Sequence, residues 1–184
     1  MAPAIRLVPI TREWLPAYEA ALAAGWSPQT TRDVSAEQLA ALRRDPDAFL
    51  DALLHGKTVT LPDGMTVPRL PSRDFLIVDA EFCGRIGLRF QPGTEALPPH
   101  VSGHVGYSIV PWKQRRGYAS EALRLLLPHA RAEGFTRLLV TCDDDNEGSK
   151  GVIRRNGGVL DHAAPHETRP GRSKLAYWVP VPPP

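Results

Sequence analysis

The chain has 184 residues, of which 42% are hydrophobic and 23% are charged, a composition that excludes disorder throughout. Its 22 basic and 20 acidic residues leave a formal charge of +2, which is too even for a dedicated nucleic-acid binder. The N-terminus lacks an apolar signal core, no apolar run is long enough to span a membrane, and two cysteines are too few for a disulfide scaffold. We therefore expect a cytoplasmic protein with no nucleic-acid or membrane partner, folded as a single domain over 1–184.

Hydrophobic spacing predicts one strand and three helices in the first third of the chain. Residues 4–10 alternate as a strand, and apolar residues then recur at helical spacing over 14–25. Ser35 and Gln38 have the spacing of a capping box, which predicts that a second helix begins there. A third, short helix is expected over 47–54.

The middle of the chain predicts strands joined by turns. Pro62-Asp63-Gly64 is a hairpin-type turn signal, and 91–100 is a loop rich in Pro and Gly. We expect strands over 57–61, 65–68, 74–79, 82–90 and 101–110.

The C-terminal half alternates helices with strands. Apolar residues from Ala119 to Ala130 lie on one face of a strong helix, and a shorter helix covers 146–156. The proline-rich end, 180–184, is expected to be a flexible tail. Further strands are expected over 137–141, 159–162 and 174–179. These elements predict an α/β (α+β) fold class, with a mixed, mostly antiparallel central sheet and helices on both faces.

One segment, Val105–Ala119, carries the clearest chemistry, because a strand leads through a basic turn into the start of a helix. A helix start exposes about four unpaired N–H groups and carries about half a positive charge. Gly117 allows close backbone approach, and Lys113, Arg115 and Arg116 add positive charge. The segment therefore predicts a site for a phosphate or pyrophosphate, with an ordinary solvated basic turn as the alternative. Its glycine spacing matches neither a P-loop nor a dinucleotide fingerprint.

The string Gln114-Arg115-Arg116-Gly117-Tyr118-Ala119 resembles the acetyl-CoA signature Gln/Arg-x-x-Gly-x-Gly/Ala of the GNAT family of N-acetyltransferases. The order of elements around it agrees, as does Asn146-x-x-Ser149 at the start of the next helix. The resemblance covers about residues 74–179 and is closest to a poorly characterised bacterial branch. It implies a GNAT-like fold with an acetyl-CoA-binding core over 74–179 and an acceptor side formed by 1–73.

The resemblance implies transfer of an acetyl group from acetyl-CoA to a primary amine of a small molecule or peptide. Backbone groups near the end of the strand before the signature would pair with the pantetheine arm, and one amide would hold the acetyl carbonyl. The N–H groups of the signature would hold the pyrophosphate. The family also implies a homodimer. The cofactor-binding residues implied are Ile109, Val110, Gln114, Arg115, Arg116, Gly117, Tyr118, Ala119, Ser120, Asn146 and Ser149.

The catalytic residues are less clear from the sequence. Many GNAT enzymes use a tyrosine as general acid, and Ile153 stands at the corresponding position here. A base would help because an amine of pKa about 10.4 is mostly protonated at pH 7. His104 and Glu81 are the candidates for that base, with a structural role for both as the alternative. The possible substitutes for the missing acid are Cys142, Tyr107 and Tyr177.

Several other polar residues allow two interpretations. Asp143-Asp144-Asp145-Asn146 resembles the start of a calcium loop, but the positions that follow do not supply the remaining ligands, so we expect no metal. Asp143 could instead attract a cationic amine, and Trp26 could border an acceptor pocket or pack in the core. Three histidines in loops are expected to be solvated: His100, His162 and His166.

Three functional hypotheses follow. The leading one is an acetyl-CoA-dependent N-acetyltransferase. The alternatives are a non-catalytic module that binds or senses CoA, and a transferase that uses another acyl-CoA.

Overall fold

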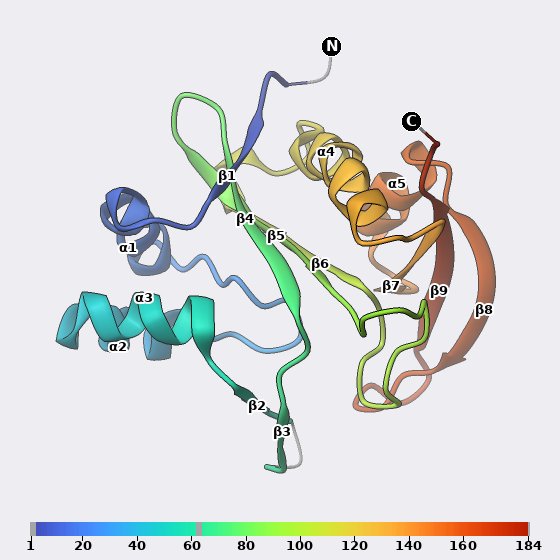
Figure 1. Cartoon of the computed structure of the whole chain (residues 1–184), viewed down its shortest axis with the longest axis horizontal. Helices are drawn as coiled ribbons and strands as arrows, with labels where there is room; N and C mark the ends of the chain where they lie inside the picture. The colour runs from blue at the N-terminus through green and yellow to red at the C-terminus, as the bar shows by residue number, and fades with distance from the viewer. Residues whose placement is uncertain (1–2, 62–63, 184) are drawn as a thin grey trace.

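The computed structural model describes residues 3–61 and 64–183. These residues form a four-stranded sheet of order β1-β4-β5-β6, a three-stranded sheet of order β7-β9-β8, and a two-stranded hairpin of β2 and β3, all antiparallel. Helices α1, α2 and α3 lie on one side of the larger sheet, and α4 and α5 lie on the other (Figure 1). The predicted α+β class with helices on both faces is confirmed. No helix of the described part of the chain is long and apolar enough to cross a membrane.

The elements in chain order are β1 (Arg6–Pro9), the 3-10 helix η1 (Arg12–Trp14), α1 (Leu15–Ala23), α2 (Ser35–Arg44), α3 (Pro46–His55), β2 (Thr58–Thr60), β3 (Thr66–Pro68), β4 (Ser72–Val78), β5 (Phe82–Arg89), β6 (Val105–Ile109), the 3-10 helix η2 (Pro111–Lys113), α4 (Tyr118–Ala132), β7 (Arg137–Asp143), α5 (Glu147–Arg155), β8 (Val159–Pro165) and β9 (Ser173–Pro180).

The predicted capping box at the start of α2 is wrong. Val34 occupies the N-cap position and makes no side-chain cap, while the side chain of Asp33 accepts a hydrogen bond from the backbone N–H of Ser35. At α3 the cap is made by Asp45, whose carboxylate accepts from the N–H of Ala48 at 3.0 Å. At both helices an aspartate shortly before the first helical residue accepts a free N–H group, as this residue type commonly does at a helix start.

Two predicted segments near the strand ends are also corrected. The strand expected over 101–110 is shorter, because the chain before β6 turns toward β7, where the N–H of His104 donates to the carbonyl of Leu139. The expected flexible tail 180–184 is wrong over its first residues. Pro180 ends β9, and Val181 is buried, with its N–H bonded to the carbonyl of Thr136.

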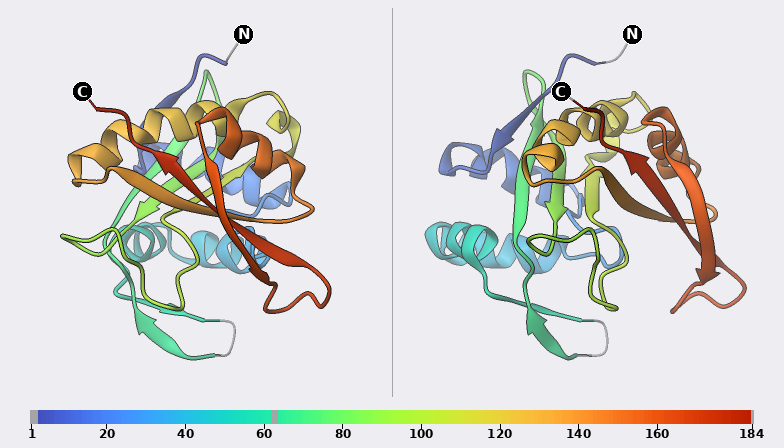
Figure 2. Two further views of the ribbon diagram at one scale, coloured as in Figure 1. Left: turned by 90° about the vertical axis from the view of Figure 1, so that its right-hand side faces the viewer. Right: turned by 45° about the vertical axis from the view of Figure 1, so that its right-hand side comes forward.

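The β2–β3 hairpin pairs Val59 with Val67, as its turn signal predicts. Turn residues 62 and 63 lie outside the described residues. The hairpin and the connection between β8 and β9 both project toward the end of the molecule opposite α4 (Figure 2).

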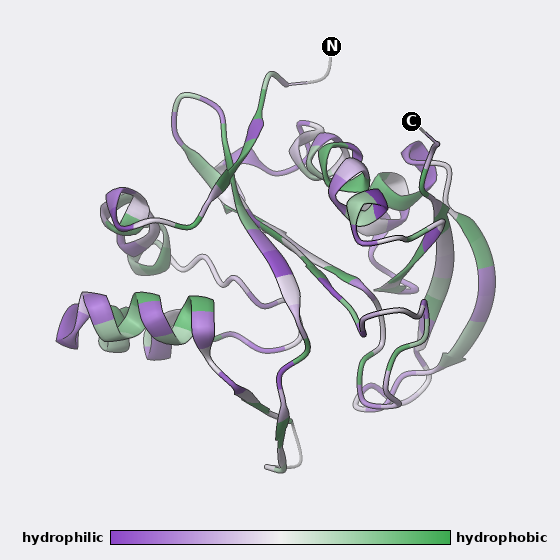
Figure 3. Ribbon diagram, in the orientation of Figure 1, coloured by the Kyte–Doolittle hydropathy of each residue, from purple (hydrophilic) through white to green (hydrophobic). Residues whose placement is uncertain are grey.

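Alternation along the strands divides the core into two clusters. Ile86 and Leu88 of β5 pack in the cluster that contains the apolar face of α4. On the opposite face of the sheet, Leu76 and Val78 of β4 pack with residues of α1, α2 and α3. Hydrophobic and hydrophilic residues alternate along α2, α3 and α4, as on helices that bury one face (Figure 3).

The two larger sheets meet at one junction, and this meeting positions the site. At the start of β6, His104 donates its N–H to Leu139 of β7 and accepts the N–H of Leu139 on its imidazole Nδ1, both at 2.8 Å. Beyond this point β6 and β7 belong to different sheets and run on separately to Ile109 and Asp143. The backbone edge of β6 that faces β7 is therefore not used in a continuous sheet.

Candidate active site

The start of α4 has the backbone geometry of an anion-binding site. Gly117 is the N-cap residue at φ 87°, and no side chain caps the helix. Arg115 also has a positive φ, 59°, which is uncommon for a residue with a side chain. Within the described chain, no backbone hydrogen bond uses the N–H groups of Arg115, Arg116 or Gly117. Successive free N–H groups in such a turn, together with the helix dipole, favour a phosphate group.

A groove of about 520 Å³ opens at this helix start. It brings together four of the implied cofactor-binding residues with basic residues from α4 and α5 that the sequence did not single out. The guanidinium groups give the groove a positive lining, which suits a pyrophosphate or a phosphorylated ribose. The lining residues are Arg115, Arg116, Gly117, Ser120, Glu121, Arg124, Arg155 and Asn156.

Lys113 does not join this groove, contrary to the expectation that it adds charge to the anion site. Its side chain is only 9% exposed, and its Nζ lies 2.8 Å from Asp79 Oδ2 and 3.1 Å from Glu81 Oε2. Tyr118 donates to the same Asp79 oxygen at 2.7 Å. The turn between β4 and β5 thereby anchors both ends of the basic loop, which explains how the loop holds its unusual backbone.

The charges of this anchor stabilise one another. Desolvation disfavours the charged form of Asp79, but hydrogen bonds from Lys113 and Tyr118 outweigh it and hold the pKa of Asp79 well below its usual range. Desolvation likewise opposes the charged form of Lys113, but the bonds to Asp79 and Glu81 raise its pKa. Glu81, a candidate base, is therefore one partner of a buried ammonium group.

The edge of β6 presents free backbone groups that could bind a ligand, but they are not all the groups that the sequence analysis expected. The N–H of Val110 donates to the carbonyl of Cys83 in β5, and its carbonyl accepts from the N–H of Lys113. Because alternate residues of an antiparallel strand point to opposite edges, the backbone groups of Ile109 and Tyr107 point toward β7. Gln114 donates its Nε2 to the carbonyl of Ile109 at 3.0 Å, which fixes the end of the strand. Tyr107 is thus a backbone candidate that the sequence analysis missed.

At the start of α5, Asn146 and Ser149 serve the helix itself. The side-chain oxygen of Asn146 accepts the N–H of Ser149 at 2.9 Å, so Asn146 is the N-cap residue. Burial outweighs the opposing influence of the nearby Ser149 hydroxyl and raises the pKa of Tyr107 to about 12. Burial also raises the pKa of Cys142 to about 11. The phenol and the thiol therefore both carry their protons at neutral pH.

The imidazole of His104 lies away from the anion groove and is fully buried at the junction of the sheets. Its Nδ1 is occupied by the N–H of Leu139, and its Nε2 has no partner in the described structure. Desolvation lowers its pKa. A neutral imidazole whose acceptor nitrogen is already bonded has no lone pair with which to remove a proton.

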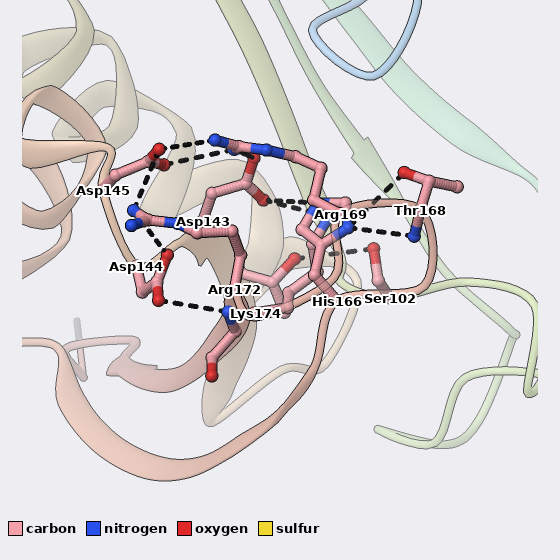
Figure 4. Close-up of polar contacts among 11 residues, drawn as sticks. Ser102, Asp143, Asp144, Asp145, His166, Thr168, Arg169, Arg172 and Lys174 are labelled. Atoms are coloured by element: carbon pink, nitrogen blue, oxygen red, sulfur yellow. Dashed lines mark hydrogen bonds and ion pairs between the residues drawn. The ribbon is translucent and has the colours of Figure 1, made fainter.

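The acidic run at the end of β7 is neutralised by basic side chains of the loop between β8 and β9 and of the start of β9 (Figure 4). Asp143 lies within 3.0 Å of Arg169, 3.3 Å of His166 and 3.4 Å of Lys174. Its charge is thus compensated, so an attraction for a cationic amine is not supported. The prediction that His166 is solvated is wrong, because its side chain is only 10% exposed and contacts Asp143.

Trp26 packs in the core and also reaches β6. Its side chain is 2% exposed and makes edge contacts with the rings of Tyr18 and Phe82. Its Nε1 donates to Ser108 Oγ at 2.9 Å, and Ser108 donates to the carbonyl of Ser27 at 2.6 Å. The loop after α1 is therefore fixed against the face of β6 opposite α4.

Comparisons with known proteins agree with this geometry. A family model described as an acetyltransferase (GNAT) domain matches residues 6–159. The ribosomal L7/L12 alpha-N-protein acetyltransferase RimL, solved with coenzyme A, is 18% identical with a TM-score of 0.66, over 96% of this chain and 94% of that one. RimJ of Mycobacterium smegmatis, in complex with CoA-disulfide, is 17% identical with a TM-score of 0.66, over 97% of this chain and 83% of that one.

A third structure, the microcin C7 self-immunity acetyltransferase MccE with acetyl-CoA and AMP, is 12% identical with a TM-score of 0.62, over 96% of this chain and 92% of that one. No curated protein matches the chain significantly. At such low identities the solved structures show only a shared fold. The family model matches most of the chain and therefore shows the family. The chain belongs to the GNAT acetyltransferase family.

Proposed function

We propose that this protein is an acetyl-CoA-dependent N-acetyltransferase that moves an acetyl group to a primary amine by direct attack. The observation that carries the proposal is the start of α4, where unbonded N–H groups, positive backbone angles and a basic groove coincide. The structures of RimL, RimJ and MccE, which share the fold, were solved with CoA or acetyl-CoA.

In this proposal the N–H groups from Arg115 to Ala119 hold the pyrophosphate, with Ser120 beside them. Arg155, which the sequence did not single out, supplies further charge for the phosphates, whereas Arg124 is paired with Glu121 in the same groove. The β6 edge at Ile109 and Tyr107 pairs with the pantetheine arm as an added strand. Val110 has no part in this pairing, because its N–H is bonded to Cys83.

The amine nitrogen attacks the acetyl carbonyl carbon, a C–N bond forms, the C–S bond breaks, and CoA leaves as its thiolate. A backbone N–H of Tyr107 or Ile109 donates to the carbonyl oxygen as negative charge develops there. We assign the proton donor for the thiolate to Tyr107, because its pKa of about 12 keeps the hydroxyl protonated at neutral pH. Ile153, at the family's tyrosine position, is fully buried and has no proton to give.

No side-chain base is assigned to the proton of the amine, which passes to solvent. His104 has its acceptor nitrogen occupied, and Glu81 pairs with Lys113. Cys142 is a protonated core thiol in this proposal, without a covalent role. The first 73 residues form the acceptor side, since α1 and the loop after it cover the face of β6 opposite α4.

Because no base is assigned, a second candidate function remains, namely a module that binds CoA without catalysis. A thiol-release assay separates the two. With acetyl-CoA and a panel of primary amines, we expect CoA release that depends on the amine and exceeds the hydrolysis rate, and we expect Tyr107→Phe to slow it about 10–100-fold. Binding of acetyl-CoA without amine-dependent release would favour the module. Faster release from propionyl-CoA or a longer thioester would indicate another acyl donor.

A further inference from the structure

An arginine without a partner lies at the end of β5. Arg89 is exposed to solvent, and no carboxylate of the described residues pairs with it. The guanidinium group of Arg89 lies against Gly106 of β6. A side chain at position 106 would not fit there, because a Cβ built on Gly106 would lie only 2.8 Å from Arg89 Nη2. The guanidinium group therefore rests over the backbone of β6.

The side of the sheet on which Arg89 lies is fixed by strand alternation. Ile86 and Leu88 point into the core against α4, so Arg85 and Arg89 point to the opposite face. Gly106 pairs with Gly87 in the register of β5 and β6, and Tyr107 follows it directly. Arg89 thus lies beside the stretch of β6 to which the acetyl group is assigned, on the face that α4 does not cover.

Positive charge is in excess around this position. Asp74 lies between two arginines, 3.1 Å from Arg69 and 2.9 Å from Arg85, and these two pairs use both of its oxygens. Asp74 therefore has no oxygen left to pair with Arg89. Desolvation and the charge of Arg85 outweigh the attraction of Asp74 and lower the pKa of Arg89. A further anion beside Arg89 would stabilise its charged form.

We propose that Arg89 binds an anionic group of the acceptor, so that the substrate is an amine whose molecule also carries a carboxylate or a phosphate. The inference rests on the proposed acetyl transfer for the identity of the neighbouring site. Arg89 acts as a binding residue that selects the acceptor and orients its amine toward β6. A guanidinium group suits this task because it binds either oxyanion with two parallel hydrogen bonds.

The test measures acceptor binding separately from chemistry. Calorimetric titrations use two matched pairs of amines, glycylglycine against glycylglycinamide and O-phosphoethanolamine against ethanolamine, each with and without saturating CoA. The first pair tests a carboxylate and the second a phosphate. The variants are Arg89→Gln and Arg89→Lys, with Arg44→Gln as a matched control, because Arg44 is an exposed arginine of α2 far along the chain from the site.

We expect the anionic member of at least one pair to bind wild type and Arg44→Gln at least tenfold more tightly, a difference of about 1.4 kcal/mol. Arg89→Gln should abolish that ratio, Arg89→Lys should keep part of it, and CoA should bind all variants equally. Equal affinity within both pairs, no binding of any member, or a ratio that survives in Arg89→Gln would overturn the proposal. An anion preference without amine-dependent CoA release would instead contradict the proposed transfer reaction and leave the role of Arg89 standing.

Discussion

Lys113 does not have the role that its position in the sequence predicts, which is to add positive charge to the anion site. It stands among arginines in a basic string, yet its ammonium group is buried against Asp79, 34 positions earlier in the chain. Arg115 and Arg116, the two arginines before the glycine, remain exposed. The charge of Lys113 therefore serves the shape of the loop, while the arginines remain free for a ligand.

The two carboxylates that face Lys113 should differ in their effect on stability. We expect Asp79→Asn to lower the free energy of unfolding by about 1.5–3 kcal/mol, because it removes charged hydrogen bonds to a buried group. Glu81→Gln should cost less than about 1 kcal/mol, because the Glu81 side chain is 75% exposed. Urea denaturation of both variants at pH 7 checks this, and equal costs would contradict the assignment of Asp79 as the anchor.

The same anchor sets a pH dependence. The folded pKa of Asp79 lies below its ordinary value of 3.8, so its contribution is present above about pH 4 and is lost as the pH falls through the folded value. Lys113 has a raised pKa, so its contribution is present below its ordinary value of 10.5 and is lost at still higher pH. The stability difference between wild type and Asp79→Asn should accordingly shrink as the solution is acidified below pH 4.

Site residues close together in the sequence were predictable, and those brought together by the fold were not. The positive φ of Gly117 and the open helix start follow from a local string. The burial of His166 depends on its contact with Asp143, 23 residues earlier, and the bonding of Val110 depends on Cys83 in another strand. Spacing along one strand or helix carries no information on such pairings.

At the scale of elements, the loop between β8 and β9 is fixed to the turn between β7 and α5 by charge (Figure 4). Arg169 contacts Asp143 and Asp145, and Arg172 contacts Asp144 and Asp145. The side chains are partly exposed, so each pair alone contributes little to global stability. Their combined effect should be local, holding the loop in one place beside the end of β7.

The double variant Arg169→Ala/Arg172→Ala should therefore loosen the loop without unfolding the protein. We expect faster amide hydrogen exchange over residues 166–172 and a change in Tm of only a few degrees. Arg32→Ala, which breaks an exposed pair with Glu37, serves as the control and should leave exchange in this loop unchanged. Unchanged exchange in the double variant would mean that backbone pairing of β8 with β9 alone fixes the loop.

Element order was largely predictable, but element ends were less so. Strong periodicity identified α4 and the strands β4, β5 and β7, and the observed bounds differ from the expected ones by a few residues. The strand before the signature was expected to begin too early, because the N–H of His104 donates to Leu139 of β7 while only its carbonyl still bonds to Arg89 of β5. The C-terminal prolines resemble a tail, yet Val181 reaches an apolar site in the core.

For the whole molecule, the feature with the greatest functional weight is the division of the strands into two sheets that meet at His104 and Leu139. A single central sheet was expected, since no sequence pattern shows where neighbouring strands stop pairing. The division leaves the edge of β6 free next to the start of α4. The proposed cofactor site thus depends on topology as much as on the basic string.

The central claim is that the start of α4 binds acetyl-CoA, and calorimetric titration of the purified protein tests it most directly. Gly117→Ala should weaken binding at least tenfold, because alanine at φ 87° strains the backbone that presents the N–H groups. Gly134→Ala is the matched control, since Gly134 follows the other end of α4 at φ 89° with open space around it. We predict micromolar or tighter binding to wild type and to Gly134→Ala. Absence of binding to wild type up to millimolar acetyl-CoA, or unchanged binding to Gly117→Ala, would contradict the account.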